Sequence, residues 1–182
     1  MTILERLKTE ILTGDGAVGT MLYAKGVSLA SNFEHLNLVR PSLVLELAGE
    51  YAAAGAQVIE TNTFGANRSK LAAIGRGHKV AEINAAGARI ARQAAAQESG
   101  VLVAGSVGPL VLVKGDEREL TGAEMEAVFN EQCRALAAAG IDFFLLETFA
   151  ALPQLLAAVR AARETGLPVC ACMAFLEGGA QR

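Results

Sequence analysis

The sequence has no tryptophan, few other aromatic residues and no basic stripe, and these shortages exclude several classes of protein. Its 16 basic and 19 acidic residues give a formal net charge of -3. No lysine and arginine cluster interleaves with aromatic side chains, so a nucleic acid partner is not expected. No apolar run reaches the roughly 20 residues that a membrane-spanning helix needs, so no membrane partner is expected.

Cysteine is also scarce. Three cysteines, loosely spaced, argue against a disulfide framework and for a reducing compartment. Residues 1–8 mix charges and lack the apolar centre of an export signal, so we predict a cytoplasmic location. The 182 residues, 52% of them hydrophobic, are enough for a real core, and we predict one domain over 1–182.

The stretch from Ile11 to Thr20 organises the chain. Its two leading apolar residues predict a short buried strand at 11–14, and a turn with one carboxylate follows. Gly14 and Gly16 flank Asp15 there. Glycines lack the Cβ atoms that keep a ligand away from the backbone, which makes this turn a candidate ligand site.

Apolar segments alternate with helical patterns along the rest of the chain. The stretch 17–37 is mixed, and residues 114–120 predict a charged loop. Strands that are apolar throughout and alternate with helices indicate a parallel sheet covered on both faces, hence the α/β class. The predicted strands are 58–64, 101–106, 143–148 and 168–175, and the predicted helices are 2–8, 41–54, 71–74, 80–97, 121–139 and 153–165.

Two architectures fit five parallel strands. One is an open doubly wound sheet, and the other is a (β/α)8 TIM barrel truncated after about five strands, because a complete barrel needs about 250 residues. Polar groups follow four successive strands rather than one switch point, which favours the barrel. The sequence also stops shortly after its last strand, with no further helix.

The polar strand ends supply the candidate site residues. Asp15 and Glu147 are two carboxylates that suit amino-group binding, metal-assisted chemistry or acid–base work, or else serve as a turn cap and an arginine partner. Asn62 could orient a substrate or satisfy a loop backbone. Ser106 lies where backbone N–H groups could bind a carboxylate. The sequence leaves the direction of Glu60 open.

Cys170 and Cys172 alternate along a predicted strand and therefore face the same way. Zinc bound there would need one or two more ligands, so the pair is more typical of two small buried strand residues. Cys133 lies among alanine and leucine in a predicted helix and is expected in the core.

Five segments, in order, resemble the homocysteine S-methyltransferase family. The resemblance covers nearly the whole chain and is closest to the homocysteine-binding N-terminal domains of cobalamin-dependent methionine synthase and of the bifunctional homocysteine S-methyltransferase/methylenetetrahydrofolate reductase. The segments are Leu12–Thr20, Glu34–Leu38, Glu60–Asn67, Gly105–Pro109 and Leu145–Thr148.

The resemblance implies a (β/α)8 barrel in which zinc lowers the pKa of the homocysteine thiol, so that the thiolate takes a methyl group and becomes methionine. Asp15 and Glu147 would hold the amino end of homocysteine. Backbone near Gly16 and Ser106 would receive its carboxylate, and Asn62 lies in the most recognisable family motif. The implied methyl donors are methylcobalamin/methyltetrahydrofolate or S-methylmethionine, and further C-terminal domains are implied partners.

The chain departs from the family at the metal. The family's zinc ligands are cysteines in Gly-x-Asn-Cys and Gly-Gly-Cys-Cys segments, and neither occurs here. We therefore expect no metal ligands in this chain, the family cysteines lying beyond Arg182, and an inactive 182-residue fragment with two unpaired strand edges. The alternatives are an inactive truncated barrel acting as a binding or assembly module, and another enzyme class on a doubly wound sheet.

Overall fold

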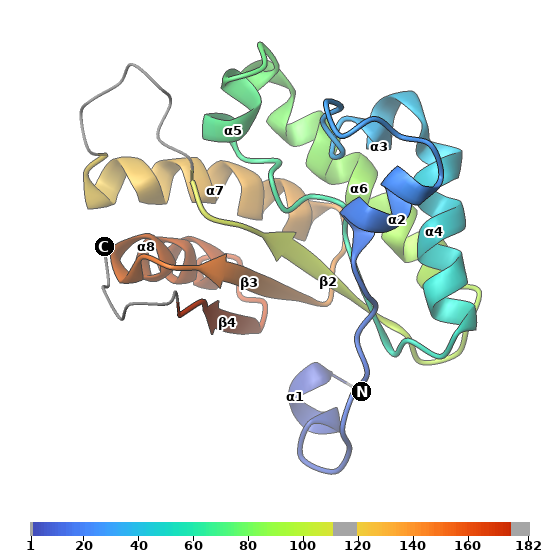
Figure 1. Cartoon of the computed structure of the whole chain (residues 1–182). Coiled ribbons are helices and arrows are strands. Elements are labelled where there is room, and N and C mark those ends of the chain that lie inside the picture. Colours follow the sequence, from blue (N-terminus) through green and yellow to red (C-terminus); the bar gives the residue numbers. More distant parts are fainter. Residues whose placement is uncertain (1, 111–119, 176–182) are drawn as a thin grey trace.

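Four parallel strands form the sheet in the computed structural model, which describes residues 2–110 and 120–175 (Figure 1). They are β1 (Val58–Glu60), β2 (Leu102–Val107), β3 (Phe143–Phe149) and β4 (Val169–Met173). Their spatial order is β1-β2-β3-β4. Each strand therefore adds to the same edge as its predecessor, with no reversal of direction across the sheet.

Helices connect the strands, and most of them match the ranges predicted from the sequence. Thr121 caps α7 through a capping box with Glu124, as its spacing predicts. The prediction lacks α2 and α3, which lie in or beside the stretch 17–37 that shows no clear periodicity, and it also lacks the 3-10 turn η1. The helices are α1 (Ile3–Arg6), α2 (Val18–Ala24), α3 (Leu36–Val39), α4 (Pro41–Ala53), α5 (Arg68–Ala72), the 3-10 turn η1 (Gly77–Lys79), α6 (Val80–Ala95), α7 (Gly122–Ala138) and α8 (Leu152–Arg163).

The main core lies between the sheet and the helices α4, α6, α7 and α8. Alternate strand residues point into it, among them Ile59, Val103 and Phe144, all fully buried. The alanines of α6 and α8 let these helices approach the strands closely. Phe129 of α7 meets Phe149 of β3 there, with ring centroids 5.9 Å apart.

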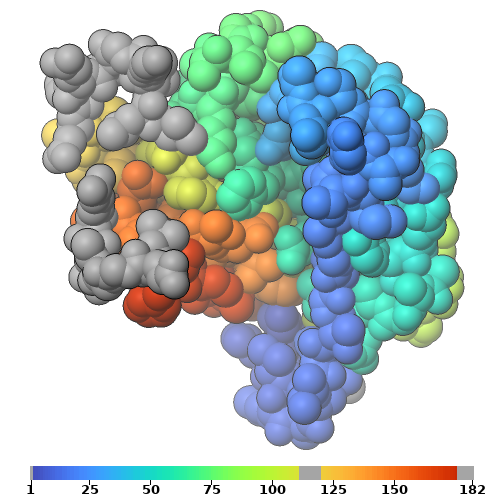
Figure 2. Space-filling model, viewed as in Figure 1, coloured from blue at the N-terminus to red at the C-terminus, as the bar shows by residue number. Residues whose placement is uncertain are grey.

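The opposite, inner face of the sheet is covered only in part. Among the described residues, this inner face carries a small cluster in which Ile3 of α1 packs against Val58, Leu102 and Phe143. Figure 2 shows the N-terminal segment crossing the front of the molecule, with α1 projecting below. Helices on one face and a sequential strand order are not the arrangement of an open doubly wound sheet, whose strand order reverses at a switch point.

The predicted strand at 11–14 is reduced to one parallel bridge between Gly14 and Val58. The backbone oxygen of Thr13 accepts from Gln57 and Val58 at 2.8 and 3.2 Å, and Asp15 N–H donates to Val58 at 3.0 Å. The prediction of a buried strand was wrong for Ile11, which is 94% exposed. The glycine-rich turn ends the pairing after these bonds, so the segment anchors Asp15 beside β1.

No helix in the part of the chain that the structure describes is long and apolar enough to cross a bilayer. Most of the predicted charged loop at 114–120 lies outside the described residues, as does the end of the chain after 175.

Candidate active site

The carboxyl ends of the strands bring polar side chains to the inner face of the sheet. Residues alternate between faces along a strand, so each of these polar residues shares a face with the apolar residue two positions before it. The pairs are Val58 and Glu60, Ala104 and Ser106, and Leu145 and Glu147. The apolar members of these pairs belong to the inner-face cluster. The polar groups therefore form the next layer above it, at the edge where parallel α/β sheets bind ligands.

A cavity of about 510 Å³ opens at this edge. The five residues predicted for the site all line it, namely Asp15, Gly16, Asn62, Ser106 and Glu147. The cavity thus unites residues that are up to 132 positions apart in the chain, from 15 to 147. Its lining also includes residues that the sequence left unassigned, described below.

Asp15 is fixed by the chain of β1. Its Oδ2 accepts the backbone N–H of Glu60 at 2.9 Å, whereas its Oδ1 is buried without a hydrogen-bond partner among the described residues. Burial raises the pKa of Asp15 to about 6, and Glu147 adds to the increase. One oxygen of this carboxylate is therefore held in place while the other is left for a donor.

Glu147 lies at a β-bulge in β3. Pairing with β4 shifts between Leu146 and Phe149, and Thr148 adopts a φ of 62°, which a non-glycine residue rarely does. The bulge turns Phe149 toward the helices, where it is fully buried. Burial of that ring offsets the strained backbone, and Glu147 is left facing the cavity, where Ser106 Oγ donates to its Oε1 at 2.5 Å.

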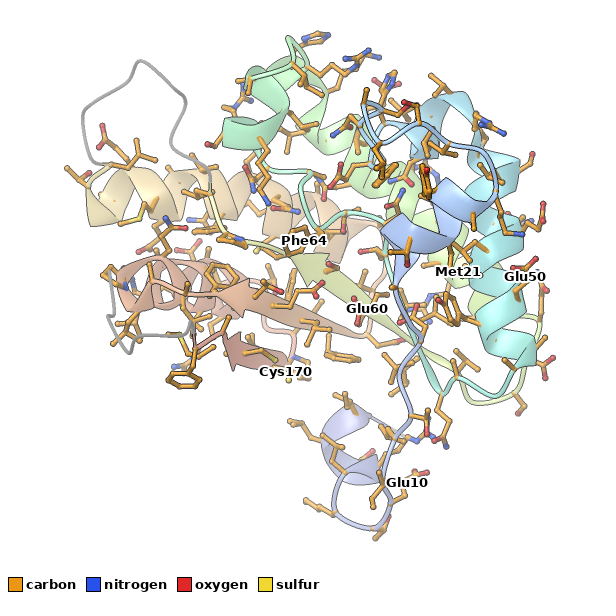
Figure 3. The ribbon with its side chains drawn as sticks, viewed as in Figure 1. Glu10, Met21, Glu50, Glu60, Phe64 and Cys170 are labelled. Atoms are coloured by element: carbon orange, nitrogen blue, oxygen red, sulfur yellow. The ribbon has the colours of Figure 1, made fainter. Side chains whose placement is uncertain are left out.

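Glu60 also faces the cavity, which answers the question that the sequence left open. Figure 3 shows Glu60 toward the middle of the molecule, in contrast to Glu10 and Glu50 at its periphery. Burial raises the pKa of Glu60 to about 8, with further contributions from the charges of Glu147 and Asp15 and a hydrogen bond to Glu147. Glu60 therefore keeps its proton near neutral pH.

Asn62 joins two of the sequence motifs. Its Nδ2 donates to Phe33 O at 2.8 Å and to Asn37 Oδ1 at 2.9 Å, and Asn37 Nδ2 donates back to Asn62 O at 2.8 Å. Both amide protons of Asn62 are thus committed to protein. These contacts agree with the alternative that Asn62 satisfies a loop backbone. Asn62 still borders the cavity.

The segment before α3 covers the other side of the cavity, and sequence reasoning assigned it no site role. Glu34 Oε1 accepts the backbone N–H of Gly65 at 2.7 Å. A Cβ at Gly65 would lie 2.4 Å from that oxygen, so a larger residue would push the Glu34 carboxylate away from this N–H. The pairing of a glutamate with a glycine across 31 positions leaves no periodic signal in the sequence.

Gly16 also has a role in packing. A Cβ there would lie 2.8 Å from Tyr51 Oη, which donates to Ala17 O at 3.1 Å. Tyr51 of α4 therefore fills the space into which a Cβ at Gly16 would point, while Gly16 still lines the cavity. The Gly16 N–H makes no hydrogen bond within the described part of the chain.

The cysteines do not provide a zinc site. Cys170 is exposed and Cys172 half-buried, so the prediction of two buried strand residues was wrong, because no described helix covers the inner face of β4. Cys133 is buried as expected, and burial raises its pKa to about 12. Residues 2–110 and 120–175 hold no group of three or more His, Cys, Asp or Glu able to bind a metal. The residues present therefore do not fit the zinc that the family resemblance implies.

Several known proteins resemble this chain. Betaine–homocysteine S-methyltransferase 1 of Bos taurus is 34% identical over 179 residues, covering 94% of this chain and 42% of that protein. Methionine synthase of Mycobacterium tuberculosis (strain ATCC 25618 / H37Rv) is 32% identical over 176 residues, covering 88% of this chain and 14% of that protein. The chain thus spans less than half the length of these two relatives.

The fold is also similar to a solved structure. The metallated form of the homocysteine methyltransferase MmuM from Escherichia coli superposes with a TM-score of 0.78 at 27% identity, covering 89% of this chain and 62% of that one. The family model for homocysteine S-methyltransferase matches residues 12–181. This chain therefore belongs to the homocysteine S-methyltransferase family.

Proposed function

We propose that this chain forms the homocysteine-binding part of a homocysteine S-methyltransferase and holds the amino end of the substrate. The observation that carries the proposal is the charge of the cavity. Asp15, Glu60 and Glu147 meet there, and none of the described residues that line the cavity is a lysine, arginine or histidine. Lys70 lies next to the lining, with its Nζ over the ring of Phe64. A site of this charge attracts a small cation such as the α-ammonium group of an amino acid.

The unpartnered oxygen of Asp15 supports an ammonium site. A buried carboxylate oxygen without a donor is costly, and an ammonium supplies three N–H donors. Glu147 contributes a second carboxylate oxygen, since its Oε1 already accepts from Ser106. In this proposal Asp15 and Glu147 bind and orient the ammonium.

Of the two backbone regions expected to receive the substrate carboxylate, the contacts favour the one at Gly16. The Ser106 N–H donates to Thr61 Oγ1 at 3.0 Å and cannot also bind the substrate. The Gly16 N–H lies at the cavity without a partner in the described residues. We therefore assign the carboxylate to the backbone at Gly16 and retain Ser106 as a residue that acts through Glu147.

We also propose that the sheet is an arc of a (β/α)8 barrel in a longer enzyme. The sequential strand order and the helices on one face support this proposal. A zinc-activated thiolate and a methyl donor, methylcobalamin/methyltetrahydrofolate or S-methylmethionine, would then depend on residues other than these 182. The 182-residue chain alone is expected to bind homocysteine weakly and to transfer no methyl group.

The test compares the 182-residue chain with the product of its complete reading frame. We expect the complete product to contain about one zinc per chain and to methylate homocysteine with one of the donors above. Asp15→Asn should weaken homocysteine binding by about tenfold or more, because one charge-assisted contact to the ammonium is lost.

Glu46→Gln is the matched control, because Glu46 is an exposed carboxylate that pairs with Lys25 away from the cavity. Stoichiometric zinc in the short chain, or a complete product that neither binds nor methylates homocysteine, would refute the proposal.

A further inference from the structure

Two buried threonines hold the peptide group that carries Ser106. Thr63 Oγ1 donates to the backbone oxygen of Ser106 at 2.8 Å. The backbone N–H of Ser106 donates to Thr61 Oγ1 at 3.0 Å, and the two threonine oxygens lie 2.5 Å apart. Thr61, Thr63 and Ser106 are 2%, 0% and 2% exposed, so solvent does not compete for these bonds.

The direction of every bond in this ring is determined. A hydroxyl has one proton, and that of Thr63 is used on Ser106 O. Thr61 must therefore donate to Thr63. The sequence of donors runs from Ser106 N–H to Thr61, from Thr61 to Thr63, and from Thr63 to Ser106 O. Both polar groups of the Ser106 main chain are consequently held by one closed ring, in which the bonds polarise one another.

The ring determines what Ser106 can do for Glu147. With its main chain fixed, the single hydroxyl proton of Ser106 is directed at Glu147 Oε1, 2.5 Å away. This charge-assisted bond holds one oxygen of the carboxylate and orients the other. Helix α7 also holds the main chain of Thr63 in place, because Gln132 Nε2 donates to Thr63 O at 2.8 Å.

We propose that Thr61 and Thr63 are positioning residues that orient the Glu147 carboxylate for the substrate ammonium, acting through Ser106. The proposal rests on the proposed function of the cavity. It assigns a role to two threonines that border the cavity but whose hydroxyl protons are committed to the ring. It also explains why a hydroxyl is needed at two fully enclosed positions where valine would fill the same space.

The experiment measures homocysteine kinetics of the complete protein with single substitutions. Thr63→Val, Thr61→Val and Ser106→Ala should each raise the KM for homocysteine about tenfold, with a smaller effect on kcat. Thr63→Ser keeps the hydroxyl and should restore the KM. In the Ser106→Ala background, Thr63→Val should raise the KM less than twofold further, because its effect passes through the missing hydroxyl.

Asn84→Ala is the matched control for a purely structural loss. Asn84 is fully buried in α6, and its side chain donates to Ala66 O and Val80 O at 2.8 Å, outside the ring. This substitution should lower stability and leave the KM unchanged. As a second readout, Thr61→Val in the 182-residue chain should shift the Ser106 amide proton upfield and speed its exchange, whereas Asn84→Ala should not.

The outcomes separate the two proposals. A wild-type protein that methylates homocysteine, with threonine variants whose KM stays within twofold of wild type, overturns the positioning role and leaves the proposed function intact. A KM that rises equally in Asn84→Ala, or that Thr63→Ser does not restore, also overturns it. A wild-type protein that neither binds nor methylates homocysteine overturns the proposed function and the positioning role with it.

Discussion

At the scale of single residues, Glu60 makes stability depend on pH. Its pKa in the folded chain is about 8, because of burial first and then the charges of Glu147 and Asp15, against an ordinary value of 4.5. The folded chain therefore binds this proton more tightly than the unfolded chain. The free energy of unfolding should be highest below the ordinary value and fall as pH rises toward the folded value.

Glu60→Gln should remove most of this decrease in the free energy of unfolding at alkaline pH, because glutamine has no charge to bury and can still donate to Glu147. Urea unfolding at pH 5, 7 and 9 measures the effect, and the variant should gain stability relative to wild type as pH rises. Asp15 should add a smaller decrease in the free energy of unfolding at lower pH, since its pKa is raised to about 6. Cys172 also faces Glu60, and its pKa is raised mainly by burial.

Glu46→Gln serves as the comparison for this titration. Lys25 lowers the pKa of the exposed Glu46 carboxylate, so removing Glu46 should not reduce the decrease in the free energy of unfolding at alkaline pH. If the two variants had the same dependence of stability on pH as wild type, Glu60 would not be the group responsible.

At the scale of elements, glycine decides how closely α6 approaches the strand ends. Gly87 lies in the middle of α6, where a Cβ would meet Asn37 Nδ2 and Thr63 Cγ2, each at 2.7 Å. Both neighbours belong to the hydrogen-bonded structure around the cavity. Gly87→Ala should therefore destabilise the fold by about 1–2 kcal/mol, because overpacking of about 1–3 kcal/mol exceeds the helix-propensity gain of up to about 1 kcal/mol.

Gly49→Ala in α4 is the corresponding substitution without a clash. Its Cβ would lie 3.4 Å from the side chain of Gln97, which is exposed and free to move. The expected result is a stabilisation of up to about 1 kcal/mol. Thermal unfolding of both variants tests the argument, and a Gly87→Ala protein as stable as Gly49→Ala would contradict it.

The same elements show how far the sequence predicts this structure. Apolar runs and glycine stops located all four strands, because the local pattern is strong in each of them. The polar strand ends identified the five predicted cavity residues. The bulge at Thr148 was not predictable, since it depends on Phe149 finding Phe129 across the core. The role of Glu34 was not predictable either, because it depends on a contact with Gly65, which is 31 positions away in the sequence.

At the scale of the whole molecule, the sheet has an open edge. Among the described residues, β4 pairs with β3 on one side and with no strand on the other. Its residues Cys170 and Ala171 are exposed although β4 is apolar in sequence. Such an edge offers unpaired backbone groups to another chain. We expect this edge to pair with a further strand of a longer protein, as proposed above, or with a second copy of this chain.

The 182-residue chain by itself should therefore associate through β4. Light scattering after size-exclusion chromatography, in the presence of a thiol reductant, should show species larger than a monomer that increase with concentration. Ala171→Lys places a charge on the edge strand and should shift the distribution toward monomer. Ala53→Lys makes the same change at an exposed position of α4, beside the opposite end of the sheet, and should not. A wild-type chain that stays monomeric at all concentrations would mean that the open edge is protected by some other part of the protein.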